Sequence, residues 1–326
     1  MDRRAFIGVV TCGLVVVPLA AKTQAATTVR RIGWLAFGER PSAAVVEQRY
    51  PPLRELGWIE GQNLLIEYRY ANNRAELLRP FAEKLVQLKV ELIVTQGTAA
   101  TQEAKNATTT IPIVMYSAGD PVGAGLVASL ARPGGNITGF SLLGPDTDIK
   151  LLSLLRELLP ATQRVGELFN STNPYFTDAR KRLEEAYQSL GMQPIFVGVT
   201  RANELEDAVA DVARQRAHAL HVPDDDLFLN SVSRIMRAAL RYALPTIVDR
   251  SAYLEGGGLL SYGFSLAELR RRGAAFIDKI LRGAKPADLP IEQPTQFELG
   301  INLKTAKALG ITVPQSLLLR ADQVVQ

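Results

Sequence analysis

Carboxylate side chains that follow apolar segments are the residues of this sequence with the clearest chemical potential. Asp224, Asp225 and Asp226 come directly after one apolar run, and Asp249 ends the next one. A carboxylate in a crevice of apolar and hydroxyl groups would bind an ammonium group through a charge-assisted hydrogen bond. Asp224 and Asp225 are also expected to cap a helix over residues 227–242. Asp226 and Asp249 are therefore the stronger candidates for a ligand contact.

Hydroxyl and amide side chains stand ahead of three further expected helices. They are Thr98, Ser117 with Asp120, and Asn170 with Asn173. A proline follows both Asp120 and Asn173, as is typical of the first residue of a helix. The free N–H groups and the positive dipole end of such a helix attract a carboxylate. The same side chains also serve as ordinary helix caps, and the sequence leaves both interpretations open.

Aromatic residues near the ends of expected strands offer a surface on which an apolar or aromatic group would stack. Phe37, Tyr116, Tyr175 and Tyr262 are candidates for this contact, whereas Trp34 is expected in the core. For the three tyrosines, a position in the core is an equal alternative.

The scarcity of histidine and cysteine restricts the chemistry open to this chain of 326 residues. Two histidines and one cysteine are too few for thiolate or zinc clusters, and His218 and His221 are expected on opposite faces of one strand. Residues 123–128 fit a dinucleotide-binding glycine pattern, but we expect them inside an amphipathic helix. Residues 256–258 lack the lysine of a P-loop. The sequence therefore implies no cofactor and no metal, and it disfavours an enzyme.

The N-terminus has the pattern of an export signal. Arg3 and Arg4 precede an apolar stretch over residues 6–19, which is too short to span a membrane, so residues 1–25 are predicted to be a signal peptide. The paired arginines also resemble the twin-arginine signal. Thr11 before Cys12 fits a lipid-anchored cysteine poorly, so a periplasmic protein is expected. A formal net charge of only +4, with no run of like charges, argues against a nucleic-acid partner.

Short apolar runs alternate with helical patterns along the rest of the chain, which is typical of parallel sheets covered by helices. Clear helices are expected at residues 149–159, 174–190 and 265–281. Ten strands are many for one sheet, so we predict an α/β fold with two sheets of about five strands in two similar lobes. The expected strands cover residues 31–37, 63–70, 91–96, 111–117, 136–141, 164–170, 193–200, 218–222, 245–249 and 258–264.

The boundary between the lobes is expected near residues 139–148, where glycine, serine, proline and aspartate cluster. No flexible linker of serine and glycine occurs there, so strands that pass between the lobes should join them. The first lobe is predicted to comprise residues 28–140 and about 258–290, and the second residues 141–257 and about 291–326. A ligand crevice is expected at the carboxyl ends of the strands.

Several short motifs mark the chain after the expected signal, for example LRELGW at residues 53–58, GDPVG at 119–123 and LARPGGNITG at 130–139. Together with residues 31–33, 61–63, 98–100, 157–160, 280–290 and 302–310, they resemble the ABC-transporter substrate-binding proteins. The resemblance is to the periplasmic-binding-protein-like group that includes tryptophan- and tyrosine-type binding proteins. It implies a type I periplasmic-binding-protein fold, with two Rossmann-like lobes joined by a multi-strand hinge.

The resemblance also implies a function, which is to bind a small solute between the lobes and deliver it unchanged to an ABC permease in the inner membrane. The solute is expected to be an amino acid, in particular an aromatic one, or an aromatic or other organic carboxylate. Delivery to a sensor kinase or chemoreceptor is the alternative, and a monomer is expected. The ligand carboxylate is assigned to Thr98, Ser117 and residues 170–173, and any amino group to Asp120, Asp226 or Asp249.

Overall fold

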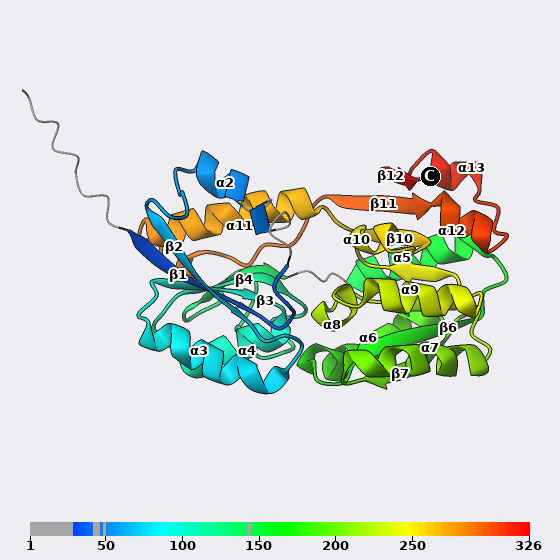
Figure 1. Cartoon of the computed structure of the whole chain (residues 1–326), viewed down its shortest axis with the longest axis horizontal. Coiled ribbons are helices and arrows are strands. Elements are labelled where there is room, and N and C mark those ends of the chain that lie inside the picture. Colours follow the sequence, from blue (N-terminus) through cyan, green and yellow to red (C-terminus); the bar gives the residue numbers. More distant parts are fainter. Residues whose placement is uncertain (1–28, 42–45, 48–49, 142–144) are drawn as a thin grey trace, which may run out of the picture.

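The structure, a computed structural model, describes residues 29–41, 46–47, 50–141 and 145–326; the expected signal peptide lies outside this part. Two α/β lobes lie side by side along the long axis of the molecule (Figure 1). The first lobe contains a five-stranded sheet in which all neighbouring strands are parallel. Its strands, in spatial order, are β2 (Leu64–Tyr70), β1 (Arg30–Ala36), β3 (Leu92–Gln96), β4 (Ile113–Ala118) and β5 (Ile137–Ser141).

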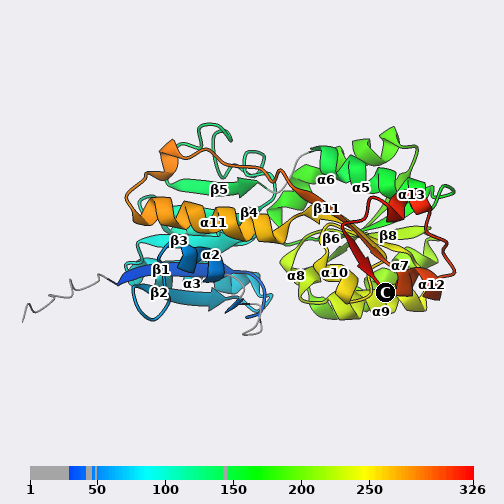
Figure 2. The same cartoon turned by 90° about the horizontal axis from the view of Figure 1, so that it is seen from above.

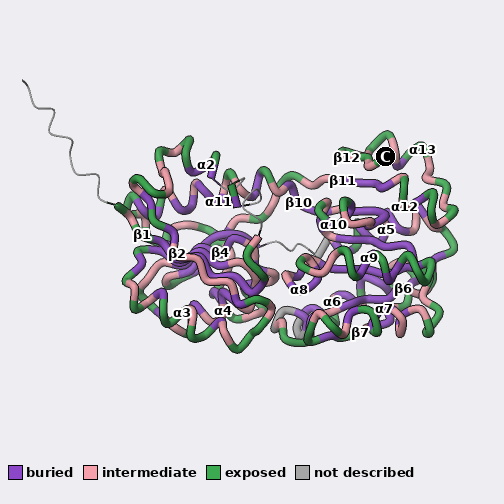
Figure 3. The backbone as a smooth tube through the Cα atoms, in the orientation of Figure 1, coloured by how far each residue is buried: buried purple, intermediate pink, exposed green. Residues whose placement is uncertain are grey.

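The second lobe is built on a seven-stranded sheet. Its neighbouring strands are parallel except for one antiparallel pair, β10 with β11. In spatial order the strands are β12 (Gln323–Val325), β11 (Phe297–Asn302), β10 (Leu260–Phe264), β9 (Thr246–Val248), β8 (Ala219–Val222), β6 (Arg164–Asn170) and β7 (Gln193–Val199). The central strands are buried, as the tube in Figure 3 shows, which explains their nearly continuous apolar sequences.

Alternate residues of a strand point to opposite sides of the sheet, and in the first sheet the residues on both sides are apolar, so helices cover both faces. Leu35 and Ile93 pack on the side of α3 (Leu78–Gln87) and α4 (Thr98–Ala107). Trp34 packs on the other side, with α2 (Tyr50–Glu55) and α11 (Leu266–Leu281). Trp34 is thus a core residue, as predicted. Tyr116, in contact with Trp34, belongs to the same core cluster.

The second sheet is covered in the same way. Leu168 and Leu220 pack against α7 (Leu205–Arg214) and α9 (Val232–Arg241). On the other face, Val165 and Ala219 pack with α5 (Pro145–Leu158), α6 (Pro174–Ser189), α12 (Leu303–Ala308) and α13 (Gln315–Leu318). The short helices α8 (Asp226–Leu229) and α10 (Ala252–Glu255) and three 3-10 turns (Ala75–Leu77, Ala202–Glu204 and Pro286–Asp288) complete the described elements.

The chain passes between the lobes more than once. It leaves the first lobe after β5, returns between β10 and α11, and crosses again through residues 292–296 to β11 (Figure 2). The last crossing pairs with the end of β5: the Ser141 amide donates to the Glu292 carbonyl over 3.0 Å, and the Glu292 amide donates to the Gly139 carbonyl over 2.9 Å. These backbone hydrogen bonds therefore join the first crossing, at the end of β5, to the last one.

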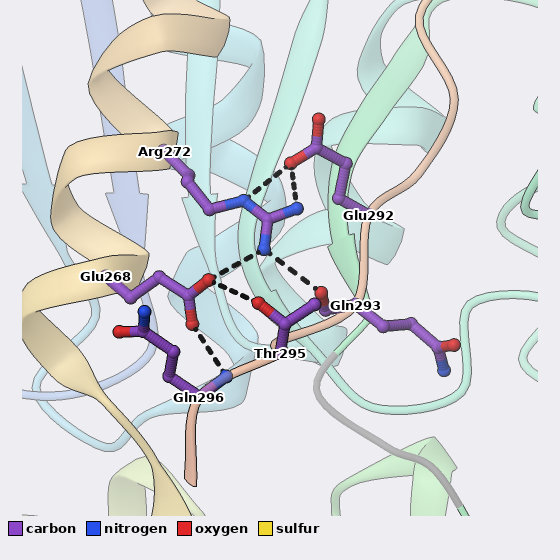
Figure 4. Close-up of polar contacts among 6 residues, drawn as sticks. All are labelled: Glu268, Arg272, Glu292, Gln293, Thr295 and Gln296. Atoms are coloured by element: carbon purple, nitrogen blue, oxygen red, sulfur yellow. Dashed lines mark hydrogen bonds and ion pairs between the residues drawn. The ribbon is translucent and has the colours of Figure 1, made fainter.

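An ionic cluster ties the last crossing to α11 (Figure 4). Arg272 donates through Nε to Glu292 over 2.7 Å and through a terminal nitrogen to Glu268 over 3.0 Å. Glu268 also accepts from the Thr295 hydroxyl at 2.8 Å and from the Gln296 amide at 3.1 Å. These bonds lower the pKa of Glu268 against the opposing effect of its burial. The cluster thus keeps Glu268 ionised and links α11 of the first lobe to the crossing at residues 292–296.

The α/β fold with two mostly parallel sheets is confirmed, and each of the ten expected strands is found within a few residues of its predicted bounds. The second sheet is larger than expected because β11 and β12 join it. Strand β10 lies in the second sheet, whereas the sequence placed residues 258–264 in the first lobe. The chain returns to the first lobe only at Ser265, since β10 pairs with both β9 and β11.

Two predicted helices were wrong. The helix expected over residues 227–242 is divided into α8 and α9, with Asn230 and Ser231 between them. The helix expected after Pro121 is a series of turns, in which Gly125 has a φ of 64° and the Asp120 carboxylate accepts from the Val122 and Gly123 amides. Within the described ranges, no helix is long and apolar enough to cross a lipid bilayer.

Candidate functional site

A cavity lies between the two lobes, at the carboxyl ends of the strands. It encloses about 1040 Å³ of space, including its open mouth, and residues of both lobes line it. The ends of β1, β3 and β4 and the residues after them form the wall of the first lobe. The ends of β6, β8, β9 and β10, together with residues of α5 and α6, form the wall of the second. This is the position expected for a ligand crevice in an open parallel sheet.

The start of α4 supplies the wall of the first lobe. Gly97, whose φ of 91° favours glycine, precedes the helix, and no side chain caps it. Gly97, Thr98 and Ala99 line the cavity together with Ser117. The Thr98 hydroxyl accepts from the Gly119 amide over 3.1 Å, which ties the two loops together. The uncapped amides of this ten-residue helix suit an anionic group, as the sequence predicted for this loop.

Asn170 and Asn173, which the sequence predicted as ligand contacts, line the cavity, but their side chains donate hydrogen bonds to Asp225. Asn170 and Asn173 donate to its two carboxylate oxygens at 3.0 and 2.8 Å. Asp225 also accepts from the Leu227 amide at 2.9 Å and caps α8, as expected. Burial raises the pKa of Asp225 even though these bonds lower it. The asparagines thus fix a buried carboxylate at the rim of the cavity.

Asp224 does not cap a helix, contrary to the sequence-based interpretation. It forms an ion pair with Arg250, and both side chains line the cavity. Burial raises the pKa of Asp224, and the Arg250 charge acts in the opposite direction. Because the two charges of this pair neutralise each other, Asp224 does not need a ligand cation.

Asp226 forms a contact between the lobes. Gln96, at the end of β3, donates to its Oδ1 over 3.0 Å, and a side-chain atom on Gly97 would lie 3.2 Å from its Oδ2. Burial, followed by the charges of Asp225 and Asp224, raises the pKa of Asp226 to about 7. Asp226 therefore lines the cavity, but its hydrogen bond is directed at the opposite lobe.

His221 lies at the centre of a buried polar network in the second lobe. Its Nδ1 is 2.7 Å from Glu167 Oε2, and its Nε2 is 3.0 Å from Asp249 Oδ1. The Tyr187 hydroxyl donates to the same Glu167 oxygen at 2.5 Å, and the Asp224 amide donates to Asp249 Oδ2 at 3.0 Å. Burial alone would lower the pKa of His221, but the two carboxylates raise it well above its ordinary value. The imidazole is therefore a cation between two anions.

Two carboxylates that the sequence pattern did not indicate, Asp148 and Glu167, lie in the same wall. Asp148 is 7% exposed and Glu167 is fully buried. Within the described part of the chain, one oxygen of each, Asp148 Oδ2 and Glu167 Oε1, has no hydrogen-bond partner. Burial, then the Asp249 charge, raises the pKa of Asp148 to about 7. A signal for Glu167 was its place in an otherwise apolar strand, directly opposite His221 of β8 in the strand register.

Most of the residues predicted for the site meet in this cavity. Phe37, Thr98, Ser117, Asn170, Asn173, Asp226 and Asp249 line it. Asp120 does not: it caps the turn after β4, and its Oδ2 lies 3.8 Å from Arg182 of the second lobe. Tyr262 stacks on Phe297 at 5.7 Å within the second sheet, away from the cavity. The Tyr175 side chain lies outside the described part of the structure.

The cavity is acidic and partly aromatic. Six carboxylates line it, against the two basic side chains His221 and Arg250. Phe37, Phe176 and Phe264 supply aromatic surface. Among the described residues, no group of histidine, cysteine and acidic side chains has the arrangement of a metal site. The cavity can therefore hold a small ligand that carries a cationic group beside an apolar or aromatic part.

Comparison with known proteins identifies relatives over most of the chain. The family model described as ABC transporter substrate binding protein matches residues 44–325. A tyrosine-binding protein of Clostridioides difficile (strain R20291) is 28% identical over 284 residues, which are 86% of this chain and 81% of that protein. The two-lobe architecture is the type I periplasmic-binding-protein fold, as predicted.

Two solved structures differ in how well they match. An ABC domain from Streptococcus pneumonia in complex with L-Trp is 28% identical, and the match covers 91% of this chain and all of that one with a TM-score of 0.84. The ligand-free, open structure of a substrate-binding protein with adhesive properties from Clostridium difficile is 27% identical with the same coverage, but its TM-score is 0.64. The structure described here thus superposes more closely on the complex than on the open structure.

Proposed function

The chain belongs to the ABC transporter substrate-binding protein family, and on that premise we propose that it is a receptor for an aromatic amino acid. The observation that carries the proposal is the cavity between the lobes, with the uncapped start of α4 on one wall and carboxylates on the other. An α-amino acid carries the two charges that these walls complement. The named ligands of two relatives, tyrosine and L-Trp, belong to the same class.

The charge of the cavity favours an amino acid over a simple carboxylate, the other ligand class that the sequence allowed. A benzoate-like acid would place its negative charge in a cavity lined by six carboxylates and only two basic side chains. It would also leave the acidic wall without a partner. The three phenylalanines of the cavity support an aromatic side chain on the ligand.

Closure of the lobes is the proposed binding event. Contacts that join the lobes at the cavity, such as Gln96 with Asp226 and Arg182 with Asp120, would form as the cleft closes. Closure excludes water, which strengthens each charged hydrogen bond to the ligand. The ligand is released unchanged, so no catalytic role is assigned to any residue.

The proposed partner is an ABC permease, to which the closed receptor delivers its ligand. Substrate-binding proteins of ABC importers act outside the cytoplasm, and the signal pattern at residues 1–25 supports export to the periplasm. We further propose that the receptor acts as a monomer. Delivery to a sensor kinase or chemoreceptor would use the same closed form.

A ligand screen tests the proposal. We expect L-tryptophan or L-tyrosine to raise the melting temperature of the purified mature protein and to bind with one-to-one stoichiometry in isothermal titration calorimetry. The panel should contain the other common amino acids, benzoate and hydroxybenzoates. Binding of the aromatic acids without binding of any amino acid would contradict the proposal.

A further inference from the structure

Two carboxylate oxygens in the second-lobe wall have no hydrogen-bond partner among the residues that the structure describes, although nearly every buried polar atom in a folded protein has one. They are Asp148 Oδ2 and Glu167 Oε1, and both residues line the cavity. Each residue is at least nine-tenths buried. A buried carboxylate oxygen without a hydrogen-bond partner lowers stability, so two of them in one cavity indicate that a bound ligand supplies the missing hydrogen-bond donors.

The network around Glu167 holds its free oxygen in place. Oε2 accepts from the Tyr187 hydroxyl and interacts with His221 Nδ1, so Oε1 is the only Glu167 oxygen left for a ligand. Asp249 holds the other nitrogen of His221 and accepts from a backbone amide through its second oxygen. Both oxygens of Asp249, a sequence-based candidate for the ligand contact, are therefore occupied, whereas Asp148 Oδ2 and Glu167 Oε1 are not.

The charge of this wall determines which kind of ligand group would bind the two free oxygens. Asp148, Glu167 and Asp249 are three carboxylates, and the cation His221 interacts with Glu167 and Asp249. Arg182 also acts on Asp148, and it lowers the pKa of Asp148 less than burial and the Asp249 charge raise it. An anionic or neutral acceptor group would be repelled here, whereas a nitrogen that carries protons and positive charge would donate to both free oxygens.

We propose that Asp148 and Glu167 together hold the cationic nitrogen of the ligand, so that a protonated amine is the group that this cleft requires. The inference rests on the proposed function and refines it, because the α-ammonium of an amino acid is the amine that the function supplies. Asp226 and Asp249, which follow strands as the sequence pattern indicated, act instead as a contact between the lobes and as a support for His221.

The proposal predicts opposite effects of one substitution on stability and on binding. Asp148→Asn removes a buried charge without a hydrogen-bond partner, so the ligand-free protein should melt at a higher temperature than the wild type. The same substitution removes one of two charged acceptors for the amine, so affinity for the amine should fall about 30-fold or more. A role for Asp148 in the fold alone would lower the melting temperature and leave affinity unchanged.

Calorimetry with three related ligands separates this proposal from the proposed function. They are L-tryptophan, 3-(indol-3-yl)propionate, which lacks the amine, and tryptamine, which lacks the carboxylate. We expect L-tryptophan to bind at least about 100-fold more tightly than the propionate, and Asp148→Asn and Glu167→Gln to reduce this preference. Asp207→Asn, the same change at an exposed position of α7, is the matched control and should alter neither property.

Equal affinity for L-tryptophan and the propionate would overturn the amine site while leaving a receptor for aromatic acids. Binding of tryptamine, L-arginine or L-lysine in place of L-tryptophan, with loss on Asp148→Asn, would support the amine site and reject the aromatic amino acid as the ligand. An Asp148→Asn protein with unchanged affinity for a bound amine would overturn the proposal. The two ideas therefore fail on different results.

Discussion

The contact between Gln96 and Asp226 leads to a prediction about closure of the lobes. An acidic residue in a binding cleft would be expected to attract a cationic ligand, but the charge of Asp226 should oppose closure. Asp226 would lose this contact in an open cleft, because Gln96 belongs to the other lobe. In the closed arrangement, burial and the neighbouring aspartates raise its pKa from the ordinary 3.8 to about 7. Ionised Asp226 therefore opposes closure, and Asp226→Asn should relieve that cost while retaining an acceptor for Gln96.

The size and pH dependence of this effect follow from the pKa. A rise from 3.8 to about 7 corresponds to about 4 kcal/mol against the ionised form above pH 7. Asp224 and Asp225 stay beside Asp226 in the open form and its side chain is partly exposed, so the part of this cost that closure adds is roughly 1–2 kcal/mol. The cost is fully present above pH 7 and declines as the pH falls toward 4, because the closed form then binds a proton. Asp226→Asn should thus tighten ligand binding about 5- to 30-fold at pH 8, with a smaller gain at pH 5.

Calorimetric titration of L-tryptophan at pH 5, 6, 7 and 8 measures the effect as a ratio of wild-type to variant affinity. All other groups titrate in both proteins, so the ratio isolates Asp226. Asp207→Asn, at an exposed position, should give a ratio of one at each pH. Weaker binding by Asp226→Asn at every pH would refute the reasoning, because it would mean that the carboxylate contacts the ligand cation, as the sequence had suggested.

Three further predictions concern the cavity wall, a close approach in the sheet and the hinge. Binding of L-tryptophan near pH 7 should release more protons, or take up fewer, in the wild type than in Asp148→Asn, seen as a difference in how the calorimetric enthalpy depends on the buffer. An ammonium beside Asp148 lowers a pKa that stands at about 7, whereas Asp226 binds a proton on closure in both proteins. Gly263→Ala would place a carbon atom against the Asp249 carbonyl oxygen, so we expect little folded protein by circular dichroism. Gly191→Ala has open space around it and only the strain of a φ of 63°, so it should fold. Arg272→Ala leaves the buried Glu268 without its cation and should lower the free energy of unfolding by about 1–3 kcal/mol in urea titration, and an unchanged midpoint would contradict a role for the hinge cluster.

The fold could be predicted from the sequence to a large extent because its strands are buried. Runs such as those of β3 and β8 are mostly apolar and begin directly after the polar residues Glu91 and His218, which fixes their position within a few residues. The assignment of elements to lobes was harder, since β10 is joined to its sheet by pairing with β9 and β11 rather than by sequence proximity. The break between α8 and α9 was also missed because the apolar pattern continues across it.

The candidate site was predicted where it follows strand ends and missed where it depends on pairing between strands. Thr98, Ser117 and the aspartates after β8 stand at positions that the topology of a parallel sheet brings together. Glu167 and His221 point into the cavity from within neighbouring strands, and only the register between β6 and β8 places them side by side. Sequence also cannot reveal which carboxylates are already occupied, so Asp249 was predicted as a ligand contact and Asp148 was not.

The identity of a ligand retained by the purified protein tests the central claim most directly. Protein purified without added ligand would be denatured gently, and the released small molecules identified by mass spectrometry against a buffer blank and an unrelated exported protein. The account predicts an aromatic amino acid, present in the wild-type sample and depleted in the Asp148→Asn sample. A retained aromatic or aliphatic acid that has no amine, at equal amounts in both samples, would contradict it.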